Sequence, residues 1–289
     1  MKILFVGVFD REGKSTNVSQ ILSLKKLDHE VSGYNYRQKA VLIGNEGRDK
    51  DLISTVKNRN FDLVIYSKCN VVLLETFREI NKYTKTCLWF MDPLISYNQE
   101  IRSKTALVDY FCCDKENVLE EALKINNNSF HVCEGFDSNI EKPHNIEKQY
   151  DVSFIGNIYG DRADLLGKIK RPVEIISNAY GKKHAVEVSK SKINLNFCTS
   201  EGASDRVYKI LAAAGFLLTD DWTNRNRCFI DGEHCVIFDN IKDLNEKISY
   251  YLNNPKEAAK IASNGHKAVQ KFNRLNWAKQ IVGLYDRIK

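Results

Sequence analysis

The sequence predicts an α/β protein built from two blocks in which strands and helices alternate. Short apolar runs typical of buried strands are followed by segments whose apolar residues recur at helical spacing, and this rhythm occurs in 1–138 and again in 139–289. Such alternation indicates parallel sheets covered by helices, which bind ligands at the carboxyl ends of their strands. The 289 residues are enough for two domains of ordinary size.

The first block is expected to begin with a buried strand, because Ile3 to Val6 is an unbroken apolar run. Apolar residues at helical spacing then predict a helix over 15–27. The remaining elements expected in this block are strands at 31–36, 62–66, 86–91, 108–113 and 130–133, and helices ending over 52–57 and spanning 72–82 and 115–125.

The second block repeats this layout after a break in periodicity between Gly135 and Pro143. Its expected strands are 151–156, 173–176, 192–197, 216–219 and 234–238, and its expected helices are 161–169, 183–190, 205–214, 241–252, 255–271 and 274–288. Two similar blocks predict two Rossmann-like domains that face each other across a cleft, 1–138 and 139–289.

Composition narrows the class of protein. No apolar run reaches the roughly 18–20 residues of a membrane helix, and the eight scattered cysteines, none in a C-x-x-C pair, are typical of free thiols in a cytoplasmic protein. The first 145 residues carry 20 basic and 20 acidic side chains, whereas the remaining 144 carry 23 and 17. The net charge of +6 therefore lies in the second block, where it suits an anionic nucleotide but is too weak to indicate nucleic acid.

The segment Glu201–Gly215 carries the strongest functional signal. It links a strand-like run, 193–197, to a short helix, so free backbone N–H groups are expected at the positive end of a helix that begins near Ser204. This arrangement is typical of anion sites, and Arg206 in the first helical turn can add a bidentate contact to phosphate. An ordinary strand–loop–helix unit with a surface arginine explains the same spacing.

Residues 7–16 imitate a phosphate-binding P-loop, but five residues separate Gly7 from Gly13 where the P-loop has four. We therefore interpret this stretch as an ordinary loop after the first strand, with Ser15 or Thr16 capping the next helix. Asn17, with these two hydroxyls, could still contact a phosphate.

Acidic residues follow two predicted strands. Asp92 ends the run 86–91 and could accept a proton as a general base, although a helix-capping or turn aspartate before proline is the simpler interpretation. Asp10 is its rival after the first strand. Asp220 and Asp221 are adjacent and should point in opposite directions, and the six histidines lack ligand spacing, so no metal site is expected.

Several of these segments together resemble GT-B-fold glycosyltransferases, and most closely the CgeB-like (spore maturation protein) branch. The segment 201–215 is similar to the donor-site signature of that family, and 154–162 resembles its Phe-x-Gly-x-x-Tyr-x-x-Arg motif. The break around Gly135 and the Trp–Asp–Pro stretch ending at Pro93 also match. Lys209 departs from the pattern, because it stands where the family has a second glutamate that contacts the nucleotide or its ribose.

The resemblance implies that a nucleotide-diphosphate sugar, most simply a UDP-sugar, binds the second domain without a metal or other cofactor. Arg206, helped by Arg162 and Lys209, would stabilise the departing diphosphate. The other donor-binding residues it implies are Gly156, Asn157, Asn196, Glu201, Ser204 and Tyr208. Since lysine cannot accept a hydrogen bond, Lys209 must change ribose recognition or contact a phosphate.

The first domain would bind the acceptor. Its candidate residues are Asp92 as base and Asp10, Gly13, Ser15, Thr16 and Asn17 in the first loop. The resemblance also implies that helix 274–289 crosses back to the first domain, and that the sugar keeps its anomeric configuration, which would make Asp92 dispensable.

Three further hypotheses stay open. The acceptor could be a hydroxymethylated DNA base, as for phage enzymes of this size, instead of a polysaccharide or small glycan. The change at Lys209 could indicate a non-catalytic nucleotide-sugar-binding module. A P-loop kinase would require Lys14 for activity with ATP. No motif in the sequence identifies the sugar, the acceptor or the oligomeric state.

Overall fold

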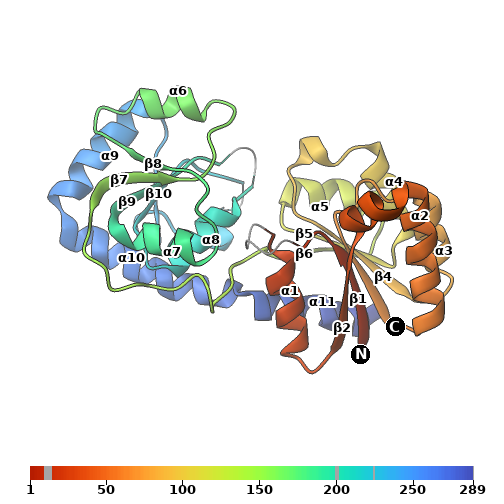
Figure 1. Cartoon of the computed structure of the whole chain (residues 1–289). Coiled ribbons are helices and arrows are strands. Elements are labelled where there is room, and N and C mark those ends of the chain that lie inside the picture. Colours follow the sequence, from red (N-terminus) through yellow and green to blue (C-terminus); the bar gives the residue numbers. More distant parts are fainter. Residues whose placement is uncertain (10–14, 199–201, 224, 289) are drawn as a thin grey trace. The chain divides into compact units, whose positions relative to one another are not determined.

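The computed structural model describes residues 1–9, 15–198, 202–223 and 225–288 (Figure 1). The chain divides into two compact units: unit 1 comprises Met1–Glu134 and Arg274–Lys289, and unit 2 comprises Gly135–Asn273. The chain thus passes between the units twice, at 134–135 and at 273–274. None of the described helices is long and apolar enough to span a bilayer.

Unit 1 contains a six-stranded, fully parallel sheet of order β2-β1-β3-β4-β5-β6. Its strands are β1 (Lys2–Gly7), β2 (Glu30–Asn35), β3 (Leu63–Ser67), β4 (Lys85–Phe90), β5 (Tyr110–Cys113) and β6 (Ser129–His131). Its helices are α1 (Asn17–Lys25), α2 (Tyr36–Arg59), α3 (Leu74–Ile80), α4 (Gln99–Leu107), α5 (Glu116–Leu123) and α11 (Arg274–Ile288), with a short 3₁₀ turn at Leu94–Ser96.

Helices cover both faces of this sheet because its strands are apolar on both sides. Leu4 and Val6 of β1 face a core formed with α2, α3, α4 and α5, whereas Ile3 and Phe5 face a second core formed with α1 and α11. Trp277 of α11 lies in that second core. The C-terminal helix is therefore an integral layer of unit 1.

Unit 2 contains a five-stranded parallel sheet of order β11-β10-β9-β7-β8. Its strands are β7 (Tyr150–Ile155), β8 (Glu174–Ile176), β9 (Ser191–Asn196), β10 (Leu217–Thr219) and β11 (Val236–Ile237). Its helices are α6 (Arg162–Gly167), α7 (Lys182–Lys190), α8 (Asp205–Ala212), α9 (Ile241–Asn253) and α10 (Pro255–Val269), with 3₁₀ turns at Arg225–Arg227 and Gln270–Phe272. The predicted fold class, two Rossmann-like α/β domains, is confirmed.

The structure contains one helix that the sequence did not predict. α4 connects the neighbouring parallel strands β4 and β5, a connection that must cross over the sheet. It begins after Asn98, whose side chain accepts a hydrogen bond from the backbone N–H of Ile101 at 3.1 Å. α2 is also longer than expected, because it continues through a break at Gly44, whose φ of 75° is left-handed.

Candidate functional site

The carboxyl ends of β7, β9 and β10 meet at the start of α8 in unit 2. Asn196, the last residue of β9, is fully buried and links this edge together. Its side-chain amide donates to the Thr219 hydroxyl at 3.0 Å, and its side-chain carbonyl accepts a hydrogen bond from the Ser204 hydroxyl at 3.0 Å. Ser204 therefore connects α8 to β9 instead of capping the helix with its side chain.

Two arginines converge on one backbone carbonyl at this edge. Arg162, the first residue of α6, donates to the carbonyl oxygen of Phe197 at 3.1 Å and to that of Asn157 at 3.1 Å. Arg206 of α8 donates to the same Phe197 oxygen at 3.3 Å. Both guanidinium groups also lie over the ring of Phe154, at 5.7 and 5.0 Å from its centroid.

The two guanidinium groups are neighbouring like charges, Arg162 buried and Arg206 half-buried, and within the described residues neither forms an ion pair. Arg162 is 3% exposed, and within the described residues its Nε and the Nη1 of Arg206 have no hydrogen-bond partner. Burial, and then the neighbouring charge of Arg162, lower the pKa of Arg206. Like charges held close together by neutral carbonyl partners are unfavourable without a counter-ion, so this edge is suited to bind a multiply charged anion.

Gly156 allows the guanidinium group of Arg206 to lie close to the backbone at the end of β7. A Cβ atom at this position would lie 2.5 Å from Nη1 of Arg206, well inside van der Waals contact. Asn157, the next residue, contributes its carbonyl to Arg162, and its amide lies 3.4 Å from the hydroxyl of Tyr180. The structure therefore brings together six predicted site residues: Gly156, Asn157, Arg162, Asn196, Ser204 and Arg206.

Two other predicted site residues on α8, Lys209 and Tyr208, contact other side chains of unit 2. Lys209 forms an ion pair with Asp205 one turn earlier, close to the buried ring of His184. Tyr208 is 4% exposed, and its ring packs against Phe229 and Phe272 with centroids 5.9 and 5.6 Å away. The tyrosine ring thus belongs to the core of unit 2 and not to the carboxyl edge of the sheet where Arg162 and Arg206 lie. Glu201 lies outside the described residues.

The two adjacent acidic residues after β10, Asp220 and Asp221, are both paired within the protein. The Asp220 carboxylate accepts hydrogen bonds from the backbone N–H of Cys198 at 2.6 Å and from the Thr219 hydroxyl at 3.2 Å, and burial raises its pKa. Asp221 pairs with Arg225 at 2.7 Å. No group of three or more potential metal ligands occurs in the part of the chain that the structure describes.

In unit 1, the described end of the first loop is tied to the sheet. The Ser15 hydroxyl donates to the carbonyl oxygen of Val8 at 2.6 Å, and the Asn17 amide donates to the same oxygen at 3.0 Å. Asn17 also accepts a hydrogen bond from Ser67 of β3 at 2.9 Å. The prediction named Ser15 or Thr16 as the cap of α1: Thr16 makes no side-chain cap, whereas the Ser15 hydroxyl accepts a hydrogen bond from the backbone N–H of Asn17, the first residue of α1, at 3.2 Å. Asp10 and Gly13 lie outside the described residues.

Asp92 follows β4 and forms an ion pair with Lys68 at 2.5 Å, both side chains being about one-third exposed. Lys68 and Cys69, which follow β3, have left-handed φ values of 61° and 52°. Two consecutive side-chain-bearing residues in this region are strained, and such strain concentrates at functional sites. Asp92 therefore lies beside a strained turn at the carboxyl edge of the sheet of unit 1.

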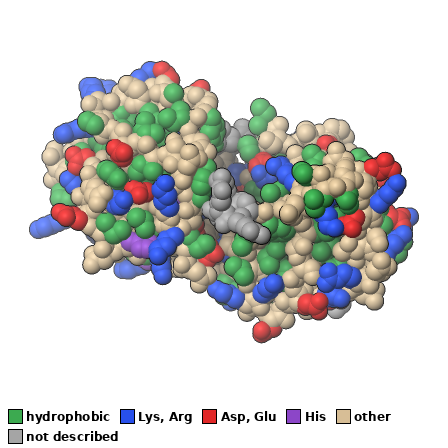
Figure 2. Space-filling view, viewed as in Figure 1, with side chains coloured by type: hydrophobic (Ala, Val, Ile, Leu, Met, Phe, Trp, Pro, Cys, Tyr) green, Lys and Arg blue, Asp and Glu red, His purple; other side chains and the backbone are tan. Residues whose placement is uncertain are grey.

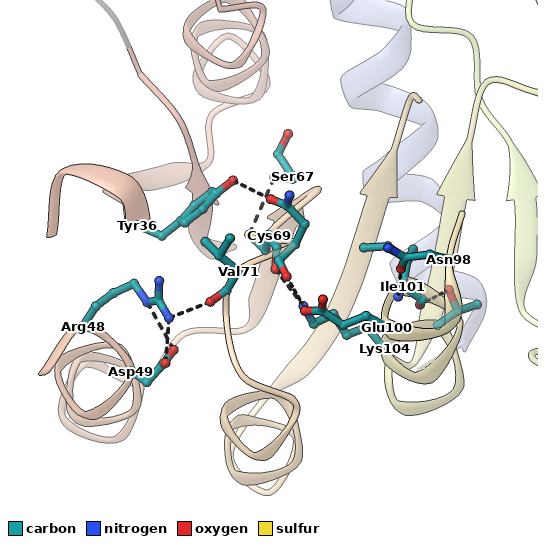
Figure 3. Close-up of polar contacts among 12 residues, drawn as sticks. Tyr36, Arg48, Asp49, Ser67, Cys69, Val71, Asn98, Glu100, Ile101 and Lys104 are labelled. Carbon is teal, nitrogen blue, oxygen red and sulfur yellow. Dashed lines mark hydrogen bonds and ion pairs between the residues drawn. The ribbon is translucent and has the colours of Figure 1, made fainter. Parts of the chain in front are cut away.

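Two buried cations hold this turn, and the sequence did not reveal them (Figure 3). Lys104 of α4 is fully buried and donates to the carbonyl oxygens of Cys69 at 3.0 Å and Asn70 at 2.9 Å. Arg48 of α2 is also fully buried and donates to the carbonyl oxygen of Val71 at 2.7 Å. These contacts satisfy backbone groups that the turn leaves outside regular structure.

Part of the chain is similar to a known protein family. Residues 142–282, just under half of the chain, match the family model described as glycosyl transferase-like. No curated protein matches the chain by sequence.

Solved structures match almost the entire fold at low identity. HepE from Anabaena in complex with UDP-glucose aligns over 99% of this chain and 100% of its own, with a TM-score of 0.71 and 11% identity. Sucrose-phosphate synthase from Thermosynechococcus elongatus covers 100% and 99%, with a TM-score of 0.74 and 12% identity. A glycosyltransferase from Rickettsia africae covers 99% and 98%, with a TM-score of 0.68 and 12% identity.

Proposed function

We propose that this chain, a glycosyltransferase of the GT-B superfamily by its family match and fold, moves a sugar from a UDP-sugar to an acceptor hydroxyl. The choice of UDP is supported by HepE, which has been solved in complexes with UDP and with UDP-glucose. The CgeB-like branch remains our assignment within the superfamily, based on the Ser204–Tyr208 segment.

The observation that carries the proposal is the pair of neighbouring guanidinium groups, that of Arg162 buried and that of Arg206 half-buried. A diphosphate would supply the negative charge that these groups lack, and the N-terminus of α8 would add its dipole. As the bond between the sugar and UDP breaks, negative charge develops on the leaving oxygen, where the same positive groups stabilise it without a metal.

The proposed reaction forms a bond between the acceptor oxygen and the anomeric carbon while the bond from that carbon to the diphosphate breaks. In a retaining reaction the acceptor proton passes to the departing diphosphate, and no protein base is needed. In an inverting reaction Asp92 is our candidate to accept that proton. We place the reaction in the cytoplasm, where free thiols such as the eight of this chain persist.

We expect the acceptor to be a glycan or another small hydroxyl compound bound by unit 1. Unit 1 carries 23 basic and 19 acidic side chains, an excess too small to indicate DNA, since DNA-binding surfaces concentrate basic residues. On the face seen in Figure 2, blue and red side chains are interspersed over each unit and form no continuous basic stripe. A binding module without activity is the competing function, because Lys209 is paired to Asp205.

The test is a titration of the protein with UDP, GDP, ADP, CMP and dTDP in the presence of a metal chelator. We expect saturable binding of UDP that weakens at least tenfold in Arg162→Ala and Arg206→Ala, because each removes a charge-assisted contact worth about 1.5–3 kcal/mol. Arg171→Ala, which removes an exposed arginine of the same unit, should leave affinity unchanged.

Three results would count against the proposal in different ways. Absence of UDP binding refutes the donor assignment, and equal loss in the Arg171 variant refutes the assigned site. UDP binding without turnover of any UDP-sugar, assayed with a panel of sugar acceptors, supports the non-catalytic module instead.

A further inference from the structure

Unit 2 contains a cavity that lies at the opposite end of the sheet from the paired arginines. It has a volume of about 440 Å³, within the usual range of small-molecule sites. Its wall includes Lys192 and Ile193 at the start of β9 and Phe216 just before β10, whereas the arginines lie where these strands end. The cavity is therefore separate from the proposed UDP site.

The lining is apolar along most of its length. Ile193, Phe216 and Leu252 contribute large side chains, and Ala258, Ala259 and Ala262 of α10 leave space opposite them. The rings of Phe216 and Tyr251 lie 4.7 Å apart between centroids and form one aromatic wall. A hydrocarbon chain would lose its contact with water here.

Positive charge is present among the lining residues. The Lys148 ammonium group donates to the carbonyl oxygens of Ser189 at 2.9 Å and Ser191 at 2.8 Å, which uses two of its three protons. Lys192 also lines the cavity but pairs with Asp151 at 2.7 Å. Lys148 thus keeps one donor and a charge with no carboxylate partner among the described residues.

We propose that this cavity binds an amphiphilic carboxylic acid, with a medium-length hydrocarbon chain against the aromatic and alanine walls and the carboxylate on Lys148. The apolar lining argues against a nucleotide or an inorganic anion, which would leave it in contact with water. The unpartnered charge of Lys148 favours an acid over a neutral lipid of the same length. The proposal does not depend on the identity of the sugar donor.

The site also adjoins the helix that carries Arg206. Ala214, just after the end of α8, lines the cavity, and the His266 ring, which is part of the same wall, lies 3.2 Å from the carbonyl oxygen of Leu211 in the last turn of α8. A bound acid would therefore contact residues that support α8 at the end remote from its N-terminus.

The experiment is a calorimetric titration of the full chain with decanoate, octanoate and decanol below their aggregation concentrations. We expect decanoate to bind saturably, octanoate about 15-fold more weakly because two methylene groups are lost, and decanol at least tenfold more weakly because it has no charge. Lys148→Met should weaken decanoate about tenfold and leave decanol unchanged, which also shows that the cavity survives the substitution.

Ala259→Phe tests the location, because it fills the cavity from its exposed side. It should abolish binding of both compounds, whereas Ala268→Phe and Lys256→Met, on the same helix but outside the cavity, should bind decanoate as the wild type does. The proposal is overturned if decanoate shows no saturable binding, if decanoate and decanol bind equally, or if Ala259→Phe binds decanoate normally. UDP affinity measured in parallel distinguishes this outcome from a failure of the proposed glycosyltransferase function.

Discussion

Replacing Gly156 by alanine is the sharpest test of the arginine site, because it adds one methyl group at a known place. The added Cβ would lie 2.5 Å from Nη1, 3.4 Å from Cζ and 3.6 Å from Cδ of Arg206, and these are the three nearest atoms. Ordinary contact begins near 3.4 Å, so the guanidinium must move by about 1 Å. Its hydrogen bond to Phe197, already 3.3 Å long, would break.

We expect this displacement to weaken UDP binding about 10- to 150-fold, which corresponds to the loss of a charge-assisted contact of about 1.5–3 kcal/mol. The fold itself should not suffer, since Gly156 does not have a left-handed φ that would strain alanine. The free energy of unfolding in urea should therefore stay close to that of the wild type.

Gly167→Ala is the matched control, because a Cβ there meets no atom within 4 Å and the residue also lacks a left-handed φ. Calorimetry of the wild type and both variants with UDP completes the experiment. If Gly156→Ala binds UDP as tightly as Gly167→Ala does, Arg206 does not contact the diphosphate from the position described.

Three further predictions concern two buried side chains, Lys104 and His184, and the candidate base Asp92. Lys104→Met should lower the free energy of unfolding by about 1–3 kcal/mol in urea titrations, because it leaves the buried carbonyl of Cys69 without its donor and removes a second, part-buried contact to Asn70. Lys50→Met, in an exposed pair, should change the free energy of unfolding little, and equal effects would contradict the role given to Lys104. Burial, and then the charge of Lys209, lower the pKa of His184 to about 3, so the unfolded state alone binds a proton below about pH 6.5 and stability should fall with decreasing pH by about 1.4 kcal/mol per unit. His184→Gln should flatten the stability profile between pH 6 and pH 4, and an unaltered slope would show that other groups dominate. Asp92→Asn should lower kcat about 100-fold or more if Asp92 is the base, whereas an unchanged kcat assigns the proton to the leaving diphosphate.

Much of unit 2 could be predicted from the sequence because its signals are local. The strand ending at Gly156 and the helix containing Arg206 are both marked by apolar runs and by their boundary residues. Parallel strands place their carboxyl ends along one edge, so the approach of Arg162 to Arg206 follows from topology. Their convergence on the Phe197 carbonyl depends on side-chain packing, which no spacing reveals.

The sequence pattern did not predict α4 and predicted only the end of α2, and both results have the same physical reason. The buried residues of α4 are Ile101, Lys104 and Thr105, so a lysine occupies a position where helical periodicity expects an apolar side chain. α2 likewise buries Arg48 and Asp49 near its middle. Buried charges that satisfy a neighbouring loop make a core-facing helix look polar, and only the tertiary structure shows their partners.

The position of α11 has a consequence for the order in which the protein can be made. Unit 2 is synthesised between the two segments that build unit 1, so the ribosome completes a whole second unit before it releases the helix that covers Phe5 and Trp89. The Trp277 ring packs at 6.4 Å from the first and 5.7 Å from the second. Until then a nascent unit 1 exposes the part of this apolar sheet face that α1 does not cover, whereas unit 2 can fold as soon as its own residues emerge.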